Sequence, residues 1–285
     1  MMRMLDAHPE ILCKGEGRFF GSSWRQKSLK KRDTMRPASS LYNALLDAEY
    51  LRLWIERSVW SRKDSPDEHL DNLTRMAIDY FLGGELIKSG KRIVGDKSPL
   101  LTPDTIREIS VIYPEAKVIH IIRDGRDVAV SAAHHARNFG RVRQRGERNE
   151  AQGSIFPEDQ LEKLAAEWIS RVGKTTEDGP SLLGENYTEV RYEDLLRKPE
   201  PEVRRLLTFL SVGSDEKSVT RCIEAASFEK LSKGRKQGEE DPSSFFRKGV
   251  AGDWKNAFTE QDRKVFGEEA GELLVRLGYE HDTDW

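Results

Sequence analysis

The stretch from Val118 to Ser131 limits the possible folds of this chain more than any other part of its sequence. It starts as an apolar run rich in β-branched residues that ends at Arg123, and a turn at Asp124 and Gly125 then leads into a run compatible with a helix. A nearly continuous apolar strand is typical of a parallel sheet that is covered on both faces. An arginine at the carboxyl end of such a strand, the amides of a helix start and a nearby serine hydroxyl together predict an anion site. The alternative is an arginine that only pairs with a neighbouring carboxylate.

A second candidate anion site lies in the segment Phe245–Asn256. Arg247 and Lys248 stand directly before Gly249 there, and a second glycine and a lysine follow. Glycines let a loop backbone approach an oxyanion closely, and the adjacent cations neutralise its charge. On its own this pattern also fits an ordinary basic loop on the protein surface.

Taken together, the two stretches resemble the sulfotransferases that use 3′-phosphoadenosine 5′-phosphosulfate (PAPS). The resemblance implies an α/β fold, with a parallel sheet flanked by helices as in P-loop NTPases, and it implies PAPS as co-substrate and no metal. It also implies that the 3′-phosphate is held by Arg123, Ser131, Arg247, Lys248 and Gly249.

Two other segments extend this resemblance to the adenine end of the nucleotide. Val190–Leu195 is similar to the Tyr-Glu-Asp segment of the family, and Ala226–Leu231 is similar to the segment with a small hydroxyl residue followed by Phe. The resemblance therefore puts Tyr192 and Phe228 near the adenine, and aromatic faces suit the stacking of a purine. The alternative for both is an aromatic residue of the core beneath a helix.

The leaving group of the reaction needs a cation, and Gly95–Pro99 supplies the candidate. Lys97 matches the family lysine that interacts with the oxygen bridging phosphate and sulfate. Without that match, Lys97 would be interpreted as a solvated lysine at a strand end. Many cytosolic sulfotransferases carry their histidine base at the position that Pro99 occupies here, so another base is expected.

The N-terminal residues resemble tyrosylprotein sulfotransferases, which suggests a glutamate base. Met4–Pro9 is similar to a segment of that subgroup, and in the following Cys13–Arg18 the position of the base falls on Glu16. A glutamate base needs partial desolvation to raise its pKa. Arg18 is expected to orient the acceptor. The alternative is a surface pair between Glu16 and Arg18.

The family's phosphosulfate loop, typically Pro-x-Ser-Gly-Thr-Thr, should come directly before Met1. We therefore expect the first strand and this loop to be missing, through a mis-set start, a shortened chain or a decayed relative. A nucleotide-binding relative without catalysis is one rival reading. A P-loop kinase-like phosphotransferase is the other, and it is weakened because the sequence contains no Gly-x-x-x-x-Gly-Lys-Ser/Thr.

Composition limits the partners of the chain. A formal net charge of −2 with 34% charged residues describes a mixed-sign surface, which gives no argument for nucleic acid. The sequence has no run of about 18 apolar residues, so no membrane span is expected. Cys13 and Cys222 are too few for a disulfide framework, which favours reduced thiols and a cytoplasmic location. The acceptor is a small molecule, a glycan or a peptide with a hydroxyl or amine group, and the oligomeric state stays open.

The order of strands and helices predicts one domain over residues 1–285, with a mostly helical cap insertion at 25–90. A charged loop is expected at 141–152, and the chain should be mainly helical after Tyr192. The pattern predicts strands at 92–96, 116–122 and 187–191, and helices from Ser65 to about Lys88, from Thr102 to before Pro114, after the turn at 124–125 to about Asn138, and from Pro157 to about Lys174.

Overall fold

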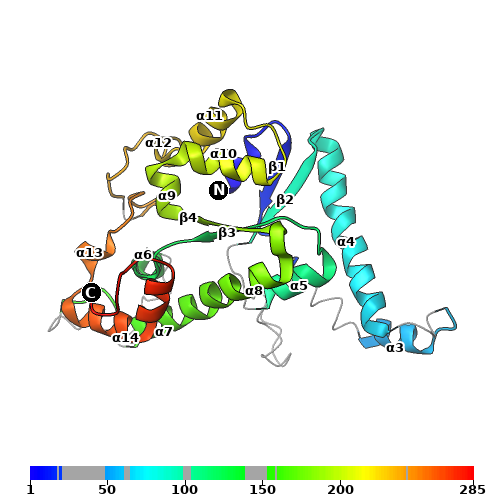
Figure 1. Cartoon of the computed structure of the whole chain (residues 1–285), viewed down its shortest axis with the longest axis horizontal. Helices are drawn as coiled ribbons and strands as arrows, with labels where there is room; N and C mark the ends of the chain where they lie inside the picture. The colour runs from blue at the N-terminus through cyan, green and yellow to red at the C-terminus, as the bar shows by residue number, and fades with distance from the viewer. Residues whose placement is uncertain are drawn as a thin grey trace. The chain divides into compact units, whose positions relative to one another are not determined.

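The computed structural model describes residues 1–17, 19–20, 49–60, 65–98, 104–138, 153–157, 159–241 and 243–285 (Figure 1). The chain forms two compact units. The first unit comprises Met1–Val118, Glu177–Thr188 and Leu210–Cys222. The second unit comprises Ile119–Thr176, Glu189–Phe209 and Ile223–Trp285. The expected charged loop at 141–152 lies outside the described residues.

A parallel strand pair is the central feature of the first unit. Helix α1 (Met2–Asp6) precedes strand β1 (Ile11–Gly15), which pairs in parallel with β2 (Ile93–Lys97). The predicted strand at 92–96 is confirmed as β2, whereas β1 was not predicted. Because Gly15 lies opposite Lys97 in the register, both strands end at the same edge of the sheet.

Helix α4 (Pro66–Ser89) connects this strand pair to α3 (Glu49–Arg57) and α5 (Thr105–Ile112) of the first unit. Helix α3 contacts α4, which in turn contacts β2 and α5 (Figure 1). The predicted start of α4 is confirmed, since the Ser65 side chain accepts a hydrogen bond from the amide of Asp67. The predicted helix from Thr102 is observed from residue 105 onward, and residues 101–103 lie outside the described part.

Only part of the expected cap falls within the described residues. Residues 25–48 and 61–64 lie outside them, while 49–57 and 66–89 are helical as expected. In the described ranges, no helix is both long enough and apolar enough to cross a membrane.

The strand–turn–helix pattern predicted for residues 118–131 is confirmed. Strand β3 (Val118–Ile122) pairs with β4 (Tyr187–Arg191), and helix α6 (Gly125–Asn138) starts three residues after β3 ends. With a parallel strand pair and helices between successive strands, the described chain has the expected α/β class.

The remaining chain is mainly helical, as predicted. The helix expected at 157–174 is observed as α7 (Gln160–Trp168), which continues through a π-helical turn (Ile169–Gly173) into α8 (Lys174–Leu183). The later elements are a 3-10 turn (Gly184–Asn186), α9 (Tyr192–Arg197), α10 (Pro199–Phe209), α11 (Glu216–Ala225), α12 (Phe228–Leu231), α13 (Trp254–Ala257) and α14 (Glu260–Arg276).

The core of the second unit forms where α6, α7, α13 and α14 pack together (Figure 1). Phe266 and Leu274 of α14 are fully buried there, next to Trp168 and Trp254. A charged residue, Arg126, lies in the same region and is only 2% exposed.

Arg126 is held by two aromatic rings and two carboxylates. Its guanidinium carbon lies 3.8 Å from the centroid of the Trp254 ring and 4.4 Å from that of Trp285. One amino group pairs with Asp124 at 2.8 Å, and the other pairs with Glu280. A buried cation with this set of partners ties the first turn of α6 to the C-terminal residues.

The packing of Arg126 against Trp254 and Trp285 and its two ion pairs give a prediction for stability. Arg126→Leu should lower the free energy of unfolding by about 3–5 kcal/mol, because Asp124 and Glu280 lose their cation while Asp124 stays buried. Arg204→Leu is the matched control, since Arg204 is a half-exposed arginine of α10 that pairs with Glu200 at 3.0 Å. The control should change stability by no more than about 1 kcal/mol. Equal effects in chemical denaturation would contradict the role of Arg126.

Candidate functional site

Arg123 stands at the end of β3 with a buried nitrogen that lacks a partner. Its Nε atom is buried and has no hydrogen-bond partner among the described residues. Its guanidinium lies over the ring of Tyr192, 4.8 Å from the centroid. No carboxylate of the described ranges lies within ion-pair distance of it, so the alternative of a simple ion pair is not supported. A buried donor of this kind is available to an acceptor atom of a bound anion.

Tyr192 contacts this arginine, whereas Ser131 lies further along the helix that follows it. Tyr192 is the first residue of α9, and burial raises the pKa of its phenol while the Arg123 cation acts in the opposite direction. Ser131 is half-buried and lies six residues after the start of α6, about 9 Å along the helix axis. The structure therefore places Arg123 against Tyr192 and leaves Ser131 further along α6.

The start of α6 differs from the expectation. The amide of Asp124 donates to Glu193 Oε1 at 3.0 Å, and the amide of Arg126 donates to Asp124 Oδ1 at 2.9 Å. The prediction that the helix start offers free amides to an anion is wrong for these two groups, because carboxylates of the chain already occupy them. Charged side chains must therefore supply more of any anion binding here.

Arg247 and Lys248 form an ion-pair cluster with Asp253. Lys248 Nζ lies 2.7 Å from Asp253 Oδ1, and Arg247 pairs with both Asp253 and Glu240. Burial of Asp253 opposes its ionisation, but hydrogen bonds from Lys248 and Arg247 outweigh it and lower the pKa of this carboxyl to about 2. The segment is therefore an ordered cluster of charges rather than a loop of solvated lysines and arginines.

Gly249 joins this cluster to Phe228. Its φ of +68° lies in the left-handed region, and a Cβ atom at this position would stand 2.1 Å from Cδ2 of Phe228. Its carbonyl accepts a hydrogen bond from Gln237 Nε2 at 2.7 Å. Only glycine fits here, because the ring of Phe228 fills the space that a side chain needs.

The carboxylate of Asp127 connects the two motifs. It accepts hydrogen bonds from the amides of Gly252 at 2.7 Å and Trp254 at 3.0 Å. Burial raises the pKa of Asp127, while these two amides and the nearby Arg123 cation act in the opposite direction. The helix that follows Arg123 is therefore fixed to the loop that follows Gly249.

Asp127 and Asp253 were missed by the sequence reasoning, which considered only the cations and glycines of the two motifs. A signal was present, because each aspartate lies within six residues of a predicted anion-binding cation. Such acids commonly fix the position of a basic side chain or of a loop amide.

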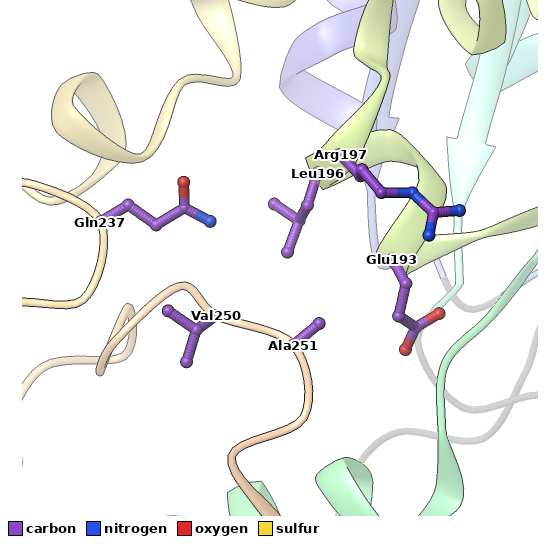
Figure 2. A pocket seen from close by; sticks show the side chains of 6 residues that line it. All are labelled: Glu193, Leu196, Arg197, Gln237, Val250 and Ala251. Carbon is purple, nitrogen blue, oxygen red and sulfur yellow. The ribbon is translucent and has the colours of Figure 1, made fainter. Parts of the chain in front are cut away.

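A pocket of about 360 Å³ opens next to these residues. Glu193, Leu196 and Arg197 of α9 line it on one side, and Gln237, Val250 and Ala251 of the loop line it on the other (Figure 2). Glu193 directly follows Tyr192, and Val250 directly follows Gly249, so the pocket borders both predicted nucleotide-binding segments.

The first unit holds the other predicted site residues. Lys97 Nζ lies 3.0 Å from Glu16 Oε1, and the amide of Glu16 donates to the Lys97 carbonyl at 2.8 Å. The side chain of Lys97 passes close to Gly15, where a Cβ atom would lie 3.2 Å from Lys97 Cε. The shared edge of β1 and β2 thus brings Glu16 and Lys97 together.

Glu16 is about half exposed in this structure. Its side chain is 54% exposed, because it follows the last residue of β1 at the sheet edge, so its role as a base stays a prediction. Arg18, the predicted acceptor residue, lies outside the described residues, as does its pairing with Glu16. Among the residues that the structure describes, no cluster of histidine, cysteine or acidic side chains could hold a metal ion.

Comparison with known proteins identifies the family. Residues 91–278 match the family described as "Sulfotransferase domain", so the chain belongs to the sulfotransferase family. Mouse sulfotransferase 1B1 is 28% identical over 210 residues, which cover 65% of this chain and 62% of that protein. Human sulfotransferase 1C2 is 34% identical over 86 residues, which cover 27% of this chain and 29% of that protein.

The chain thus spans less than two thirds of the length of these curated relatives. A solved structure of mouse sulfotransferase SULT7A1 complexed with PAP overlaps with a TM-score of 0.49 at 20% identity, and it covers 64% of this chain and 66% of that one. An overlap at this level is too low to place a ligand in the present chain.

The contact between Gly249 and Phe228 gives a second prediction. Gly249→Ala places a methyl group inside the ring, whereas Gly252→Ala, with φ of +79°, meets nothing within 4 Å. Both variants bear similar backbone strain, so Gly249→Ala should be less stable than Gly252→Ala by about 1–3 kcal/mol. Chemical denaturation of the two variants measures this difference, and equal stability would show that Phe228 does not pack on Gly249.

Proposed function

We propose that this protein transfers a sulfuryl group from PAPS to a hydroxyl or amine of an acceptor. The observation that carries the proposal is the buried Nε of Arg123, which has no partner in the described part of the chain, in a motif that Asp127 links to the Arg247–Gly249 segment. Membership of the sulfotransferase family supports sulfuryl transfer in general. It also weakens the kinase-like alternative.

The 3′-phosphate of PAPS is proposed to bind Arg123, Ser131, Arg247, Lys248 and Gly249. A phosphate here meets three cations, of which Arg247 and Lys248 already share the Asp253 carboxylate. The phosphate must compete with Asp253 for them, while the Nε of Arg123 has no partner to give up among the described residues. We therefore expect Arg123 to contribute most to the selectivity for a 3′-phosphate.

The adenine is proposed to lie near Tyr192 and Phe228. Each ring already contacts part of the proposed phosphate site, Tyr192 through Arg123 and Phe228 through Gly249. Placing the base next to these rings keeps the adenine and the 3′-phosphate within one nucleotide's reach.

Chemistry is proposed to occur at the pair of the first unit, Glu16 and Lys97. The acceptor oxygen or nitrogen forms a bond to sulfur while the bond from sulfur to the bridging oxygen breaks. Lys97 stabilises the negative charge that develops on the bridging oxygen, and Glu16 takes the proton of the acceptor. Their contact at 3.0 Å supports a shared site, in which Lys97 leaves Glu16 for the leaving group when PAPS binds.

The acceptor is proposed to be a small molecule, a glycan or a peptide, with Arg18 as a contact. The glutamate base follows from the similarity of the N-terminal residues to tyrosylprotein sulfotransferases. The single domain with its cap and a cytoplasmic location stay predictions. A non-catalytic relative differs from an active sulfotransferase in one observable property: it binds the nucleotide without turning over PAPS.

Nucleotide preference tests the proposed binding site. The protein should bind 3′,5′-bisphosphoadenosine more tightly than 5′-AMP, because the additional phosphate gains charge-assisted hydrogen bonds. Arg123→Ala should weaken the bisphosphate by about tenfold or more, since one such bond is worth roughly 1.5–3 kcal/mol, and should leave AMP nearly unchanged. Calorimetric titration with both nucleotides measures this, with Arg204→Ala on α10 as the control. Equal affinity of the unmodified protein for both nucleotides would sink the proposal.

A kinetic experiment tests the base. Glu16→Gln should reduce kcat with PAPS by roughly 10²–10⁴, the range for loss of a general base, and should leave bisphosphoadenosine affinity nearly unchanged. Glu85→Gln is the matched control, because Glu85 also pairs with a lysine of the first unit, Lys14. Full activity of Glu16→Gln, or an equal loss in both variants, would exclude Glu16 as the base.

A further inference from the structure

The chain reverses direction directly after α12, and this turn aims Arg235 back at the helix. Lys233 and Gly234 both have left-handed backbones, with φ of +61° and +105°, and the amide of Gly234 donates to the Glu229 carbonyl at 2.7 Å. The guanidinium of Arg235 consequently lies over the ring of Phe228, 5.5 Å from its centroid. Arg235 therefore sits at the centre of the 228–249 region.

The guanidinium of Arg235 makes four hydrogen bonds to the following loop. Nη1 donates to the carbonyls of Glu239 at 3.0 Å and Arg247 at 2.9 Å. Nη2 donates to the Ser244 hydroxyl at 2.9 Å and to the Phe246 carbonyl at 2.6 Å. Because each Nη carries two hydrogens, these bonds use all four of its terminal donors.

These bonds fix the backbone immediately before Lys248. The carbonyls of Phe246 and Arg247 are held by Arg235, and the carbonyl of Lys248 accepts from the amide of Gly238 at 2.9 Å. Three successive carbonyls are thus anchored by hydrogen bonds. The orientation of the Arg247 and Lys248 side chains follows from this backbone.

We propose that Arg235 is the positioning residue of the Arg247–Gly249 segment, and that through this segment it contributes to the preference for nucleotides carrying a 3′-phosphate. The inference rests on the proposed function. Arg235 acts through the loop and not on the ligand, since its terminal donors are already engaged. Lysine cannot replace it, because a single ammonium group cannot reach carbonyls and a hydroxyl spread over four loop residues in a planar fork.

The experiment compares Arg235→Ala and Arg235→Lys with the unmodified protein, and Lys236→Ala, an exposed neighbouring cation, is the control. Calorimetry gives the affinity of each for 3′,5′-bisphosphoadenosine and for 5′-AMP. In both Arg235 variants the bisphosphate should bind about tenfold more weakly or worse, while AMP should change by less than about twofold. Lys236→Ala should keep the preference of the unmodified protein.

The outcomes test the proposed function and the positioning role of Arg235 separately. If the unmodified protein itself shows no preference, the proposed function fails. If it shows the preference and the Arg235 variants keep it, the positioning role is overturned. A parallel loss of affinity for both nucleotides also overturns it, because that result indicates a merely structural arginine. Should Arg235→Ala not fold, the charge-preserving Arg235→Lys decides between these outcomes.

Discussion

The carboxylate of Asp127 is the interaction on which the rest of the candidate binding site depends. It is buried in the first turn of α6, and it accepts the amides of Gly252 and Trp254 from a loop 125 or more residues later in the chain. The same loop carries Asp253, which holds Arg247 and Lys248. Two segments that are remote in sequence thereby become one cluster of charges.

Most cations of this cluster are balanced by carboxylates of the same chain. Arg247 and Lys248 are neutralised by Asp253 and Glu240, and Arg126 is neutralised by Asp124 and Glu280. Arg123 differs from these residues, since its charge faces the ring of Tyr192 and its buried Nε lacks a partner within the described ranges. Most of the free energy of anion binding should therefore come from Arg123. Arg247 and Lys248 should contribute only the difference in free energy between pairing with Asp253 and pairing with the ligand.

The sequence was sufficient for elements and motifs with a local signal. Apolar patterns and turn residues a few positions apart predict the strand before Arg123, the helix after it, the helix N-cap at Ser65 and the strand at 187–191. Strand β1 was missed because it is short and ends in Lys14 and Gly15, which are poor strand formers. The contact of Glu16 with Lys97 was not predicted either, because it depends on the β1–β2 register.

The residues that organise the site were hidden for the same reason. Nothing local distinguishes Asp127 from any acid in the first turn of a helix, and Arg235 reads as one basic residue among several. Their roles come from partners that only the folded chain brings within hydrogen-bond distance. A cation next to a glycine is visible in a sequence, but the acid or arginine that orients it is not.

One measurement tests most directly whether the two motifs bind the same phosphate. The affinity ratio between 3′,5′-bisphosphoadenosine and 5′-AMP should be determined for Arg123→Ala, for Lys248→Ala and for the double variant. If both side chains hold one 3′-phosphate, the free-energy losses are coupled, and the double variant should lose less than the sum of the single losses by at least about 0.5 kcal/mol. Additive losses, or a ratio that responds to only one of the two residues, would contradict a single shared site.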